Sequence, residues 1–391
     1  MQHLEIKNKR ANRQTLRGSR AHSHLAATIA STLILLAACA DDAGTDGADG
    51  ADGADDNASD DNAPLFVDLP GDDLFPEGII AAPNGDLYVT GFGNGAIVRI
   101  GFARDDDGAN DGNDGNDELA VERVELFRAP GEDGLSSAVG MAIDEQRNRL
   151  WVANFSFGTF TSNMKVFDLG DGSLIATVEP ARDGPESQFF NEVTIADDGR
   201  VYISDTLTPT IWTVGPDLQL AEVLVSDPLL ANPDPERPFG LNGIALSPDG
   251  AYLIASVMDR IDPGDGRLVR IDLATQQVSD IALSGATAVF GGSDGMLFTE
   301  DGELLMVNVT PPAALVTAQF SADFSSALLV ARDRFDAILN RPTAPAIRGE
   351  RVFVVNSQLD HLIDDENGAV DTPPEIPFQI VGVAVDELLD D

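Results

Sequence analysis

One pattern of apolar and polar positions returns six times along the chain. Each copy holds a small or polar residue, an apolar pair, a short turn that often carries Asp-Gly or Asn-Gly, and a second apolar run. The copies begin at these residues: Glu77, Val139, Asn191, Asn242, Asp294 and, in a weaker form, Ala344. Their spacing is about 50 residues apart from a longer first interval, and repeats of this length are typical of propeller blades.

Each copy predicts two antiparallel strands, because Asp-Gly and Asn-Gly supply the positive φ angles that a tight hairpin needs. Further short apolar runs follow in most repeats, at residues 96–100, 164–169, 210–214 and 267–273. Four strands per repeat predict an all-β fold, a six-bladed β-propeller of four-stranded antiparallel blades. Residues 65–67 are expected to add the outermost strand to the last blade beside residues 377–385, which closes the ring and removes exposed sheet edges.

The first 38 residues read as an export signal. A region with six Lys and Arg precedes the apolar stretch Leu25–Ala38, which is too short to span a bilayer. The stretch ends in LAAC at Leu36–Cys39, which resembles the bacterial lipoprotein box, and Cys39 is the only cysteine. The resemblance implies a lipid on Cys39 and a place in the cell envelope, with the outer membrane favoured by Ala40 and the head in the periplasm or at the cell surface. A plain cleaved signal peptide is the alternative.

Two acidic tracts interrupt the apolar pattern. Residues 39–64 contain almost no apolar side chain beyond alanine, so they cannot offset their ordering entropy and are expected to form a disordered tether. Residues 105–118 form a similar tract within the repeats and account for the long first interval. Their spacing does not fit an EF-hand loop, so a solvated surface loop is expected there. The propeller is therefore assigned to residues 65–391.

Charge limits the partners. The chain has 24 Lys and Arg against 66 Asp and Glu, for a formal net charge of -42 at pH 7. Such a surface repels nucleic acid and anionic headgroups, so no nucleic acid is expected, and contact with the membrane is expected only through the lipid anchor. A single cysteine also excludes a disulfide framework within the chain.

The starts of the six repeats carry the candidate metal site. In a propeller the first strand of each blade lines the channel, and its first residue lies at the rim. Val139 and a position near Pro345 hold two of the six places, and side-chain oxygens hold the other four: Glu77, Asn191, Asn242 and Asp294. Two carboxylates and two amides without His or Cys favour a hard divalent cation, most of all calcium, with magnesium and manganese still open. Asn and Asp before Gly are also common turn residues, so a structural role stays open.

A second polar set ends the second strand of four repeats, on the same face: Asn154, Asp205, Asn308 and Asn356. These side chains are candidates for a substrate pocket or are ordinary strand-end residues. His361 is the only histidine after the leader and is expected at the surface, so a Ser-His-Asp triad is excluded. The sequence also contains no phosphate loop and no dinucleotide fingerprint.

Several of these segments together resemble a known family. EGI at Glu77, NEV at Asn191, NGIALSPDG at Asn242 and DGMLFTEDGELLMV at Asp294 are similar to the gluconolactonase/regucalcin (senescence marker protein) family. The similarity to strictosidine synthase-like and paraoxonase-like propellers is more distant. The resemblance runs from about residue 75 to 385. It implies a divalent metal on the matching Glu77, Asn242 and Asp294, with Asn191 on metal or substrate.

Active members of the family open lactones or hydrolyse related esters, and a carboxylate at the metal, here Asp294, would be the general base. Some members place an arginine near the second Asn to bind a sugar acid, and this chain has Gln188-Phe189-Phe190 there. The leading hypothesis is a metal-dependent lactonase or esterase-type hydrolase that acts on a small molecule. The alternative is a non-catalytic propeller that binds a ligand or a protein and holds a structural calcium. A quinoprotein-type dehydrogenase fits less well, because its cofactor would need basic residues.

Overall fold

The computed structural model describes residues 63–103, 120–182, 184–232, 234, 239–258, 264–308, 314–332, 338–362 and 372–385. The predicted export signal, the lipidated Cys39, nearly all of the tether and the acidic insertion lie outside these ranges, so they stay predictions. The chain divides into two units, residues 1–50 with 360–373, and residues 51–359 with 374–391. Almost every described residue belongs to the second unit. No helix in the described ranges is long and apolar enough to cross a membrane.

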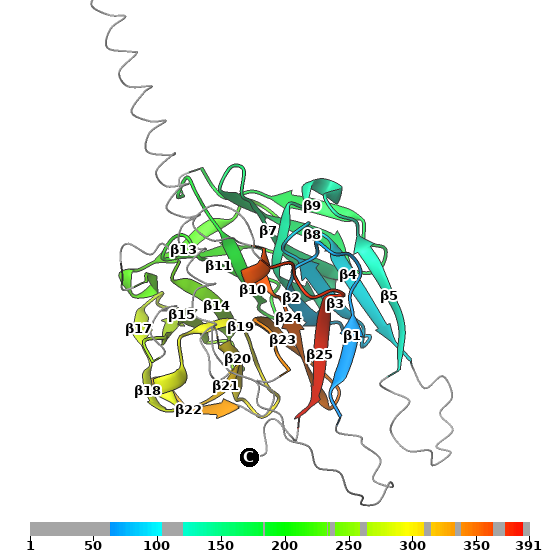
Figure 1. Cartoon of the computed structure of the whole chain (residues 1–391). Helices are drawn as coiled ribbons and strands as arrows, with labels where there is room; N and C mark the ends of the chain where they lie inside the picture. The colour runs from blue at the N-terminus through cyan, green and yellow to red at the C-terminus, as the bar shows by residue number, and fades with distance from the viewer. Residues whose placement is uncertain are drawn as a thin grey trace, which may run out of the picture. The chain divides into compact units, whose positions relative to one another are not determined.

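The described part of the second unit contains six sheets (Figure 1). The first consists of β2 (Pro76–Ala81), β3 (Leu87–Gly91), β4 (Ile97–Phe102) and β5 (Val121–Arg128). The second consists of β6 (Ser137–Asp144), β7 (Arg149–Ser156), β8 (Thr161–Asp168) and β9 (Leu174–Val178). The third consists of β10 (Phe190–Ile195), β11 (Val201–Asp205), β12 (Thr210–Val214) and β13 (Glu222–Ser226).

The fourth sheet consists of β14 (Leu241–Leu246), β15 (Tyr252–Val257), β16 (Arg267–Asp272) and β17 (Val278–Asp280). The fifth holds β18 (Ala282–Gly285), β19 (Ser293–Phe298), β20 (Leu304–Asn308), β21 (Leu315–Phe320) and β22 (Ser326–Arg332). The sixth holds β23 (Pro342–Arg348), β24 (Arg351–Asn356), β25 (Gln379–Ala384) and β1 (Leu65–Asp68). The described residues also form five short 3-10 turns: Glu132–Gly134, Glu145–Arg147, Pro228–Leu230, Thr287–Val289 and Leu359–His361.

The six-bladed propeller is confirmed, with one difference in the fifth blade. Its four antiparallel strands carry a fifth, β18, which pairs parallel with the edge strand β22 from Ala282↔Ser326 to Gly285↔Leu329. The four antiparallel strands predicted for each blade are therefore present in all six blades, and β18 is an addition to the fifth. The extended connection from blade 4 to blade 5 satisfies its backbone by pairing with an open sheet edge, and no short motif marks such a pairing in sequence.

The ring closes in the sixth blade, as the sequence predicts. β1 pairs antiparallel with β25 from Leu65↔Gly382 to Asp68↔Gln379, and Figure 1 shows this blue strand beside the red one. The Leu69 backbone amide extends the ladder by donating to the carbonyl oxygen of Phe378 at 2.7 Å. The first and last described strands therefore share one blade.

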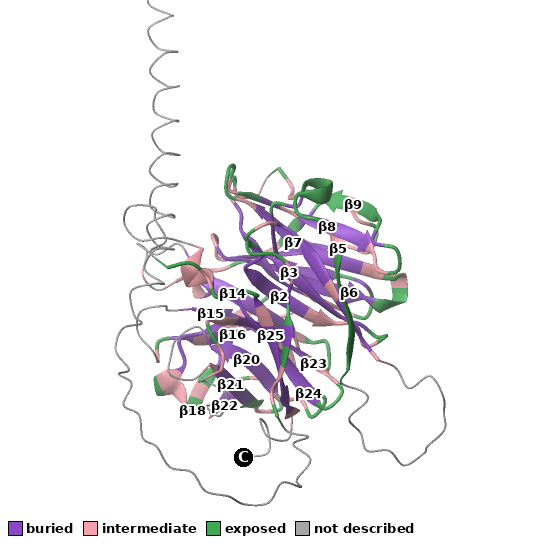
Figure 2. Cartoon of the chain, turned by 45° about the vertical axis from the view of Figure 1, so that its right-hand side comes forward, coloured by how far each residue is buried: buried purple, intermediate pink, exposed green. Residues whose placement is uncertain are grey.

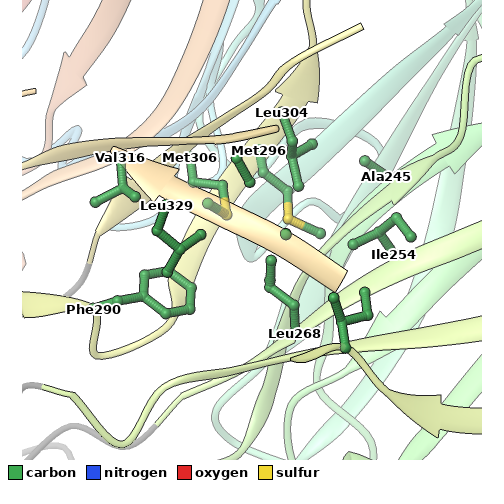
Figure 3. Close-up of a cluster of buried hydrophobic side chains, with 12 residues drawn as sticks. Ala245, Ile254, Leu268, Phe290, Met296, Leu304, Met306, Val316 and Leu329 are labelled. Carbon is green, nitrogen blue, oxygen red and sulfur yellow. The ribbon is translucent and has the colours of Figure 1, made fainter. Parts of the chain in front are cut away.

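The core is layered between neighbouring blades. One cluster joins blades 4 and 5 through side chains such as Ile254, Phe290 and Met306, and Figure 3 shows them interleaved. Inner strands such as β3 and β6 are buried along their whole length, whereas the outer strand β9 is largely exposed (Figure 2). This burial explains the continuous apolar runs of the inner strands, because both faces of each inner strand are covered.

Closure by β1 is expected to matter for stability. Val67 is 3% exposed and opposes Ile380, so Val67→Asp, which buries a carboxylate beside it, is expected to destabilise the protein by about 3 kcal/mol. Urea unfolding followed by tryptophan fluorescence measures the change. Phe66→Ser is the control, since Phe66 on the same strand is 47% exposed. Equal effects of the two substitutions would contradict a stabilising role for this pairing.

Candidate functional site

A β-bulge occurs at the same point in all six innermost strands. In β2, Pro76 pairs with Gly91 and Ile79 with Val89, so Glu77 and Gly78 together face the single residue between them on β3. The same two-against-one arrangement recurs in β6, β10, β14, β19 and β23. A bulge re-aims side chains and adds twist. The six bulges thus define equivalent positions around the channel.

The first bulge position of each blade is occupied in order by Glu77, Val139, Asn191, Asn242, Asp294 and Thr343. The sequence comparison placed the first five correctly in this column. It placed the sixth near Pro345, and that assignment is wrong, because the bulge in β23 falls between the pairs of Pro342 and Pro345. The Thr343 hydroxyl donates to the carbonyl oxygen of Glu77 at 2.5 Å, which joins blade 6 to blade 1.

Small residues at the second bulge position bring the inner strands of successive blades into close contact. A Cβ added at Gly140 would lie 2.4 Å from the carbonyl oxygen of Asn191. One added at Gly243 would lie 2.2 Å from the carbonyl oxygen of Asp294. Because each glycine meets the bulge of the next blade, the candidate side chains occupy one level of the channel.

Glu192 is the exception in this second column, where the other blades have Gly78, Gly140, Gly243, Gly295 and Ala344. Its side chain is buried, and its Oε2 would lie 3.0 Å from a Cβ on Gly140, so the carboxylate reaches over the preceding blade. Its backbone amide donates to the Ser204 hydroxyl at 3.0 Å. The sequence reasoning missed Glu192, because the column of glycines becomes visible only once the bulge register is known.

Three carboxylates interact at this level of the channel. Burial raises the pKa of Glu77 well above its ordinary value, and the charges of Asp294 and Glu192 raise it further. Burial also raises the pKa of Glu192 to about 8, the charge of Asp294 adds to the shift, and a hydrogen bond from the Val193 backbone amide opposes it. Both shifts have the same cause: three carboxyl groups lie close together in a desolvated place, which disfavours their ionised forms.

Three predicted ligands each leave a buried oxygen without a hydrogen-bond partner: Glu77 Oε2, Asn191 Oδ1 and Asn242 Oδ1. The amide nitrogen of Asn191 is held, since it donates to the Thr206 hydroxyl at 2.9 Å. The amide nitrogen of Asn242 lies 3.2 Å from the Met258 sulfur. A buried oxygen without a donor costs about 1–3 kcal/mol, so three in one ring are an arrangement that a bound cation would stabilise.

Asp294 differs from the other three candidates because it is half-buried rather than buried. It is therefore the one member of the set that solvent reaches. No three His, Cys, Asp or Glu side chains among the described residues are arranged to hold a metal ion on their own. Any metal bound here would depend on the two amide oxygens in addition to the carboxylates.

The second polar set occupies a different environment. Each member is buried and hydrogen-bonds backbone just before the first strand of its own blade. Asn154 Oδ1 accepts from Ser136 N at 2.7 Å, and Asp205 Oδ1 accepts from Phe189 N at 2.9 Å. Asn308 Oδ1 accepts from Gly291 N, and Asn356 Oδ1 from Asn340 N, each at 3.0 Å. These hydrogen bonds give the four side chains a structural task, and their pocket role stays a prediction.

Asp205 is the only carboxylate among the four side chains of this second polar set. It also accepts hydrogen bonds from Leu207 N, the Thr208 hydroxyl and Trp212 Nε1. Burial nevertheless raises the pKa of Asp205 to about 6, because desolvation outweighs the four donors. His361, expected at the surface, is half-buried, and its Nδ1 lies 3.0 Å from the Thr372 carbonyl oxygen.

Known proteins of similar structure share this fold. No known family model matches the sequence, and no curated protein is similar to it in sequence. The major allergen Mala s 1 of Malassezia sympodialis is 15% identical with a TM-score of 0.59, over 83% of this chain and 97% of its own. The gluconolactonase XC5397 of Xanthomonas campestris is 15% identical with a TM-score of 0.51, over 82% and 89%.

Virginiamycin B lyase of Staphylococcus aureus, in a catalytically inactive form, is 12% identical with a TM-score of 0.51, over 82% of this chain and 99% of its own. The shared feature is the propeller. At such low identities the similarity concerns the fold alone. The expected resemblance to a gluconolactonase is therefore confirmed at the level of fold, and the activity has to be argued from the channel residues.

Close contact between inner strands is testable at Gly140. Gly140→Ala is expected to destabilise the protein by about 2 kcal/mol, because its methyl group would overlap the backbone of blade 3. Gly158→Ala is the control, since the nearest atom to a Cβ there is Ser156 Oγ at 3.9 Å. Chemical unfolding curves of the two variants measure the difference. If both unfold at the same urea concentration, the channel wall is looser than described.

Asp205 predicts a pH dependence of stability. Its folded pKa of about 6 exceeds the unfolded value, so its contribution is fully present below about pH 4 and is lost as the pH rises to 6. The loss is about 3 kcal/mol. Asp205→Asn stays neutral, so the wild type should lose stability relative to this variant between pH 4 and 7. A difference in unfolding free energy that does not change with pH would show that the four donors keep Asp205 ionised.

Proposed function

We propose that this protein is a metal-dependent hydrolase of lactones or related esters. The observation that carries the proposal is the set of three unpartnered buried oxygens on Glu77, Asn191 and Asn242, at one level with the carboxylate of Asp294. Buried polar atoms without partners are rare in folded proteins and call for an explanation, such as a missing ion. The gluconolactonase-type fold agrees with this assignment without establishing it.

The donor set fits calcium best. All four candidate ligands are hard oxygen donors, and no thiolate or imidazole is among them. The chain supplies them from four different blades, and calcium accepts such irregular oxygen shells more readily than magnesium, which demands a regular octahedron. Glu192 adds a third carboxylate beside the set. We assign the ligand role to Glu77, Asn191, Asn242 and Asp294, and a charge-supplying role to Glu192.

The proposed chemistry depends on which of the four ligand side chains a substrate can reach. A bound divalent cation supplies polarisation of a carbonyl group and lowers the pKa of water. Glu77, Asn191 and Asn242 are buried and would hold the cation, whereas Asp294 is half-buried and is the member of the set that an incoming substrate could reach. Asp294 takes the proton of the attacking water, the water oxygen bonds to the carbonyl carbon, and the ring C–O bond breaks. The proton then passes to the leaving alkoxide.

The location belongs to the same proposal. Removal of residues 1–38 and lipidation of Cys39 would place the propeller at the cell envelope, on the acidic tether of residues 39–64. The enzyme would then meet small molecules outside the cytoplasm. The strongly acidic surface, with a net charge of -42 for the whole chain, agrees with a soluble head that touches the membrane only through its anchor.

The test compares metal binding with turnover. Calcium should raise the melting temperature of the wild type, and Glu77→Gln should weaken calcium binding by at least about tenfold, because a charged ligand is lost. Asp294→Asn should lower lactone hydrolysis by about a hundredfold or more. Glu222→Gln on β13 is the control, since Glu222 is exposed.

The three outcomes separate the hypotheses. Calcium-dependent hydrolysis that is lost in Asp294→Asn and kept in Glu222→Gln supports the hydrolase. Calcium binding without hydrolysis of any lactone or ester in a broad panel supports the alternative, a binding propeller with a structural calcium. Absence of binding of calcium, magnesium and manganese by calorimetry would overturn the metal assignment.

A further inference from the structure

Six phenylalanines form a continuous cluster in blades 1 to 4. Its members are Phe92, Phe155, Phe157, Phe160, Phe189 and Phe239. The ring of Phe189 is central: it stacks on Phe155 at 4.3 Å between centroids and contacts Phe92 at 6.2 Å and Phe239 at 6.4 Å. This set is called the phenylalanine cluster below.

The cluster lies on the same face as the candidate metal ligands. Phe189 stands two residues before Asn191, and Phe239 three residues before Asn242, each at the start of an inner strand. The Phe92 backbone amide donates to the Phe75 carbonyl oxygen at 2.9 Å, just before Glu77. The backbone that positions the ligands therefore also positions the rings.

The cluster also joins blades that are not neighbours. Phe92 belongs to blade 1 and Phe189 to blade 3, which are not neighbours in the ring. Their rings nevertheless contact each other, at 6.2 Å between centroids, so the cluster bridges two blades that flank blade 2. Asp294 comes from blade 5, which stands opposite blade 2 in a six-bladed ring. Asp294 therefore belongs to the blade opposite the one that carries Phe155, Phe157 and Phe160.

Part of the cluster is open to solvent. Phe157 is 40% exposed, although its ring contacts Phe92 at 5.5 Å and Phe155 at 4.8 Å. Phe160 is half-buried with a φ of 56°, an uncommon conformation for a bulky residue. An exposed ring that rests on buried rings forms an apolar surface against which a ligand can pack. The neighbouring Asn154 and Asp205 each have a side-chain oxygen that accepts a hydrogen bond from a backbone amide.

We propose that the phenylalanine cluster binds the apolar part of the substrate. The proposal rests on the proposed function and names its substrate class: lactones or esters with an alkyl chain or aromatic ring beside the reacting carbonyl, rather than polyhydroxylated sugar lactones. Aromatic walls favour apolar groups through buried area, at about a fourfold gain in binding for each methylene group. The hydroxyl groups of a sugar lactone would lose their water against phenyl rings without gaining partners.

The experiment measures kcat/KM of the full-length protein, with calcium, for γ-butyrolactone, γ-octalactone, γ-dodecalactone and glucono-δ-lactone. The value should rise by about fourfold per methylene across the γ-lactones until the chain exceeds the cluster. Phe157→Ser should lower the value for γ-dodecalactone about tenfold, and by a much smaller factor for γ-butyrolactone, which carries no alkyl chain. Phe66→Ser is the matched control, since Phe66 is similarly exposed, at 47%, but lies on β1.

Failure of this inference differs from failure of the proposed function. A preference for glucono-δ-lactone, or equal rates along the γ-lactone series, overturns the inference and leaves the hydrolase standing. If no lactone is hydrolysed, calorimetric binding of γ-octalactone and γ-dodecalactone to the calcium-loaded protein decides. Affinity that grows with chain length and falls in Phe157→Ser, but not in Phe66→Ser, supports the apolar site. Absence of binding overturns it.

Discussion

The close approach of the six inner strands governs the rest of this structure. Glycine or alanine at the second bulge position of five blades lets each strand touch the backbone of the next, as at Gly140 and Gly243. Such contact leaves no room for larger side chains at this position in those five blades, so the residues at the first bulge position meet at one level. The hydroxyl of Thr343 completes the circle by bonding the Glu77 carbonyl oxygen. The geometry of the candidate site is therefore a product of backbone packing.

The same arrangement concentrates unfavourable electrostatics. Glu77, Glu192 and Asp294 raise each other's free energy in the charged state, and burial adds to the effect. A structure selected for stability alone would avoid this grouping, because buried like charges oppose folding. Proteins tolerate such local cost where function requires it. In the channel, the grouped carboxylates lower the stability of the fold, and the proposed metal site requires the same grouping.

The sequence predicted the blades well, because a period of about 50 residues and Asp-Gly turns depend on local chemistry. It also placed Glu77, Asn191, Asn242 and Asp294 in one column. It could not place Thr343, because the weak sixth repeat hides the bulge that fixes its register. The sequence also did not reveal Glu192, for a related reason. Glu192 stands out only when the second bulge positions of all six blades are compared, and the bulge register is needed to align them.

Strand-end residues show a second limit. Asn154 and Asn191 are the same residue type near the same rim, yet one oxygen accepts a backbone amide and the other has no donor. Only the partner separates a structural amide from a candidate ligand, and the partner comes from a loop whose path the sequence does not reveal. The added strand β18 is similar, because its partner β22 lies about 40 residues further along the chain.

The pairing of β1 with β25 has a consequence for how the chain is made. β1 is translated before every other described strand of the propeller, and its partner, Gln379–Ala384, after all of them. Blade 6 cannot assemble until both strands are present, so the ring stays open until the blades between them have been synthesised. A ribosome that stalls early yields a product with unpaired edges, which quality-control proteases recognise. Ring closure therefore requires that every blade between these two strands has been synthesised.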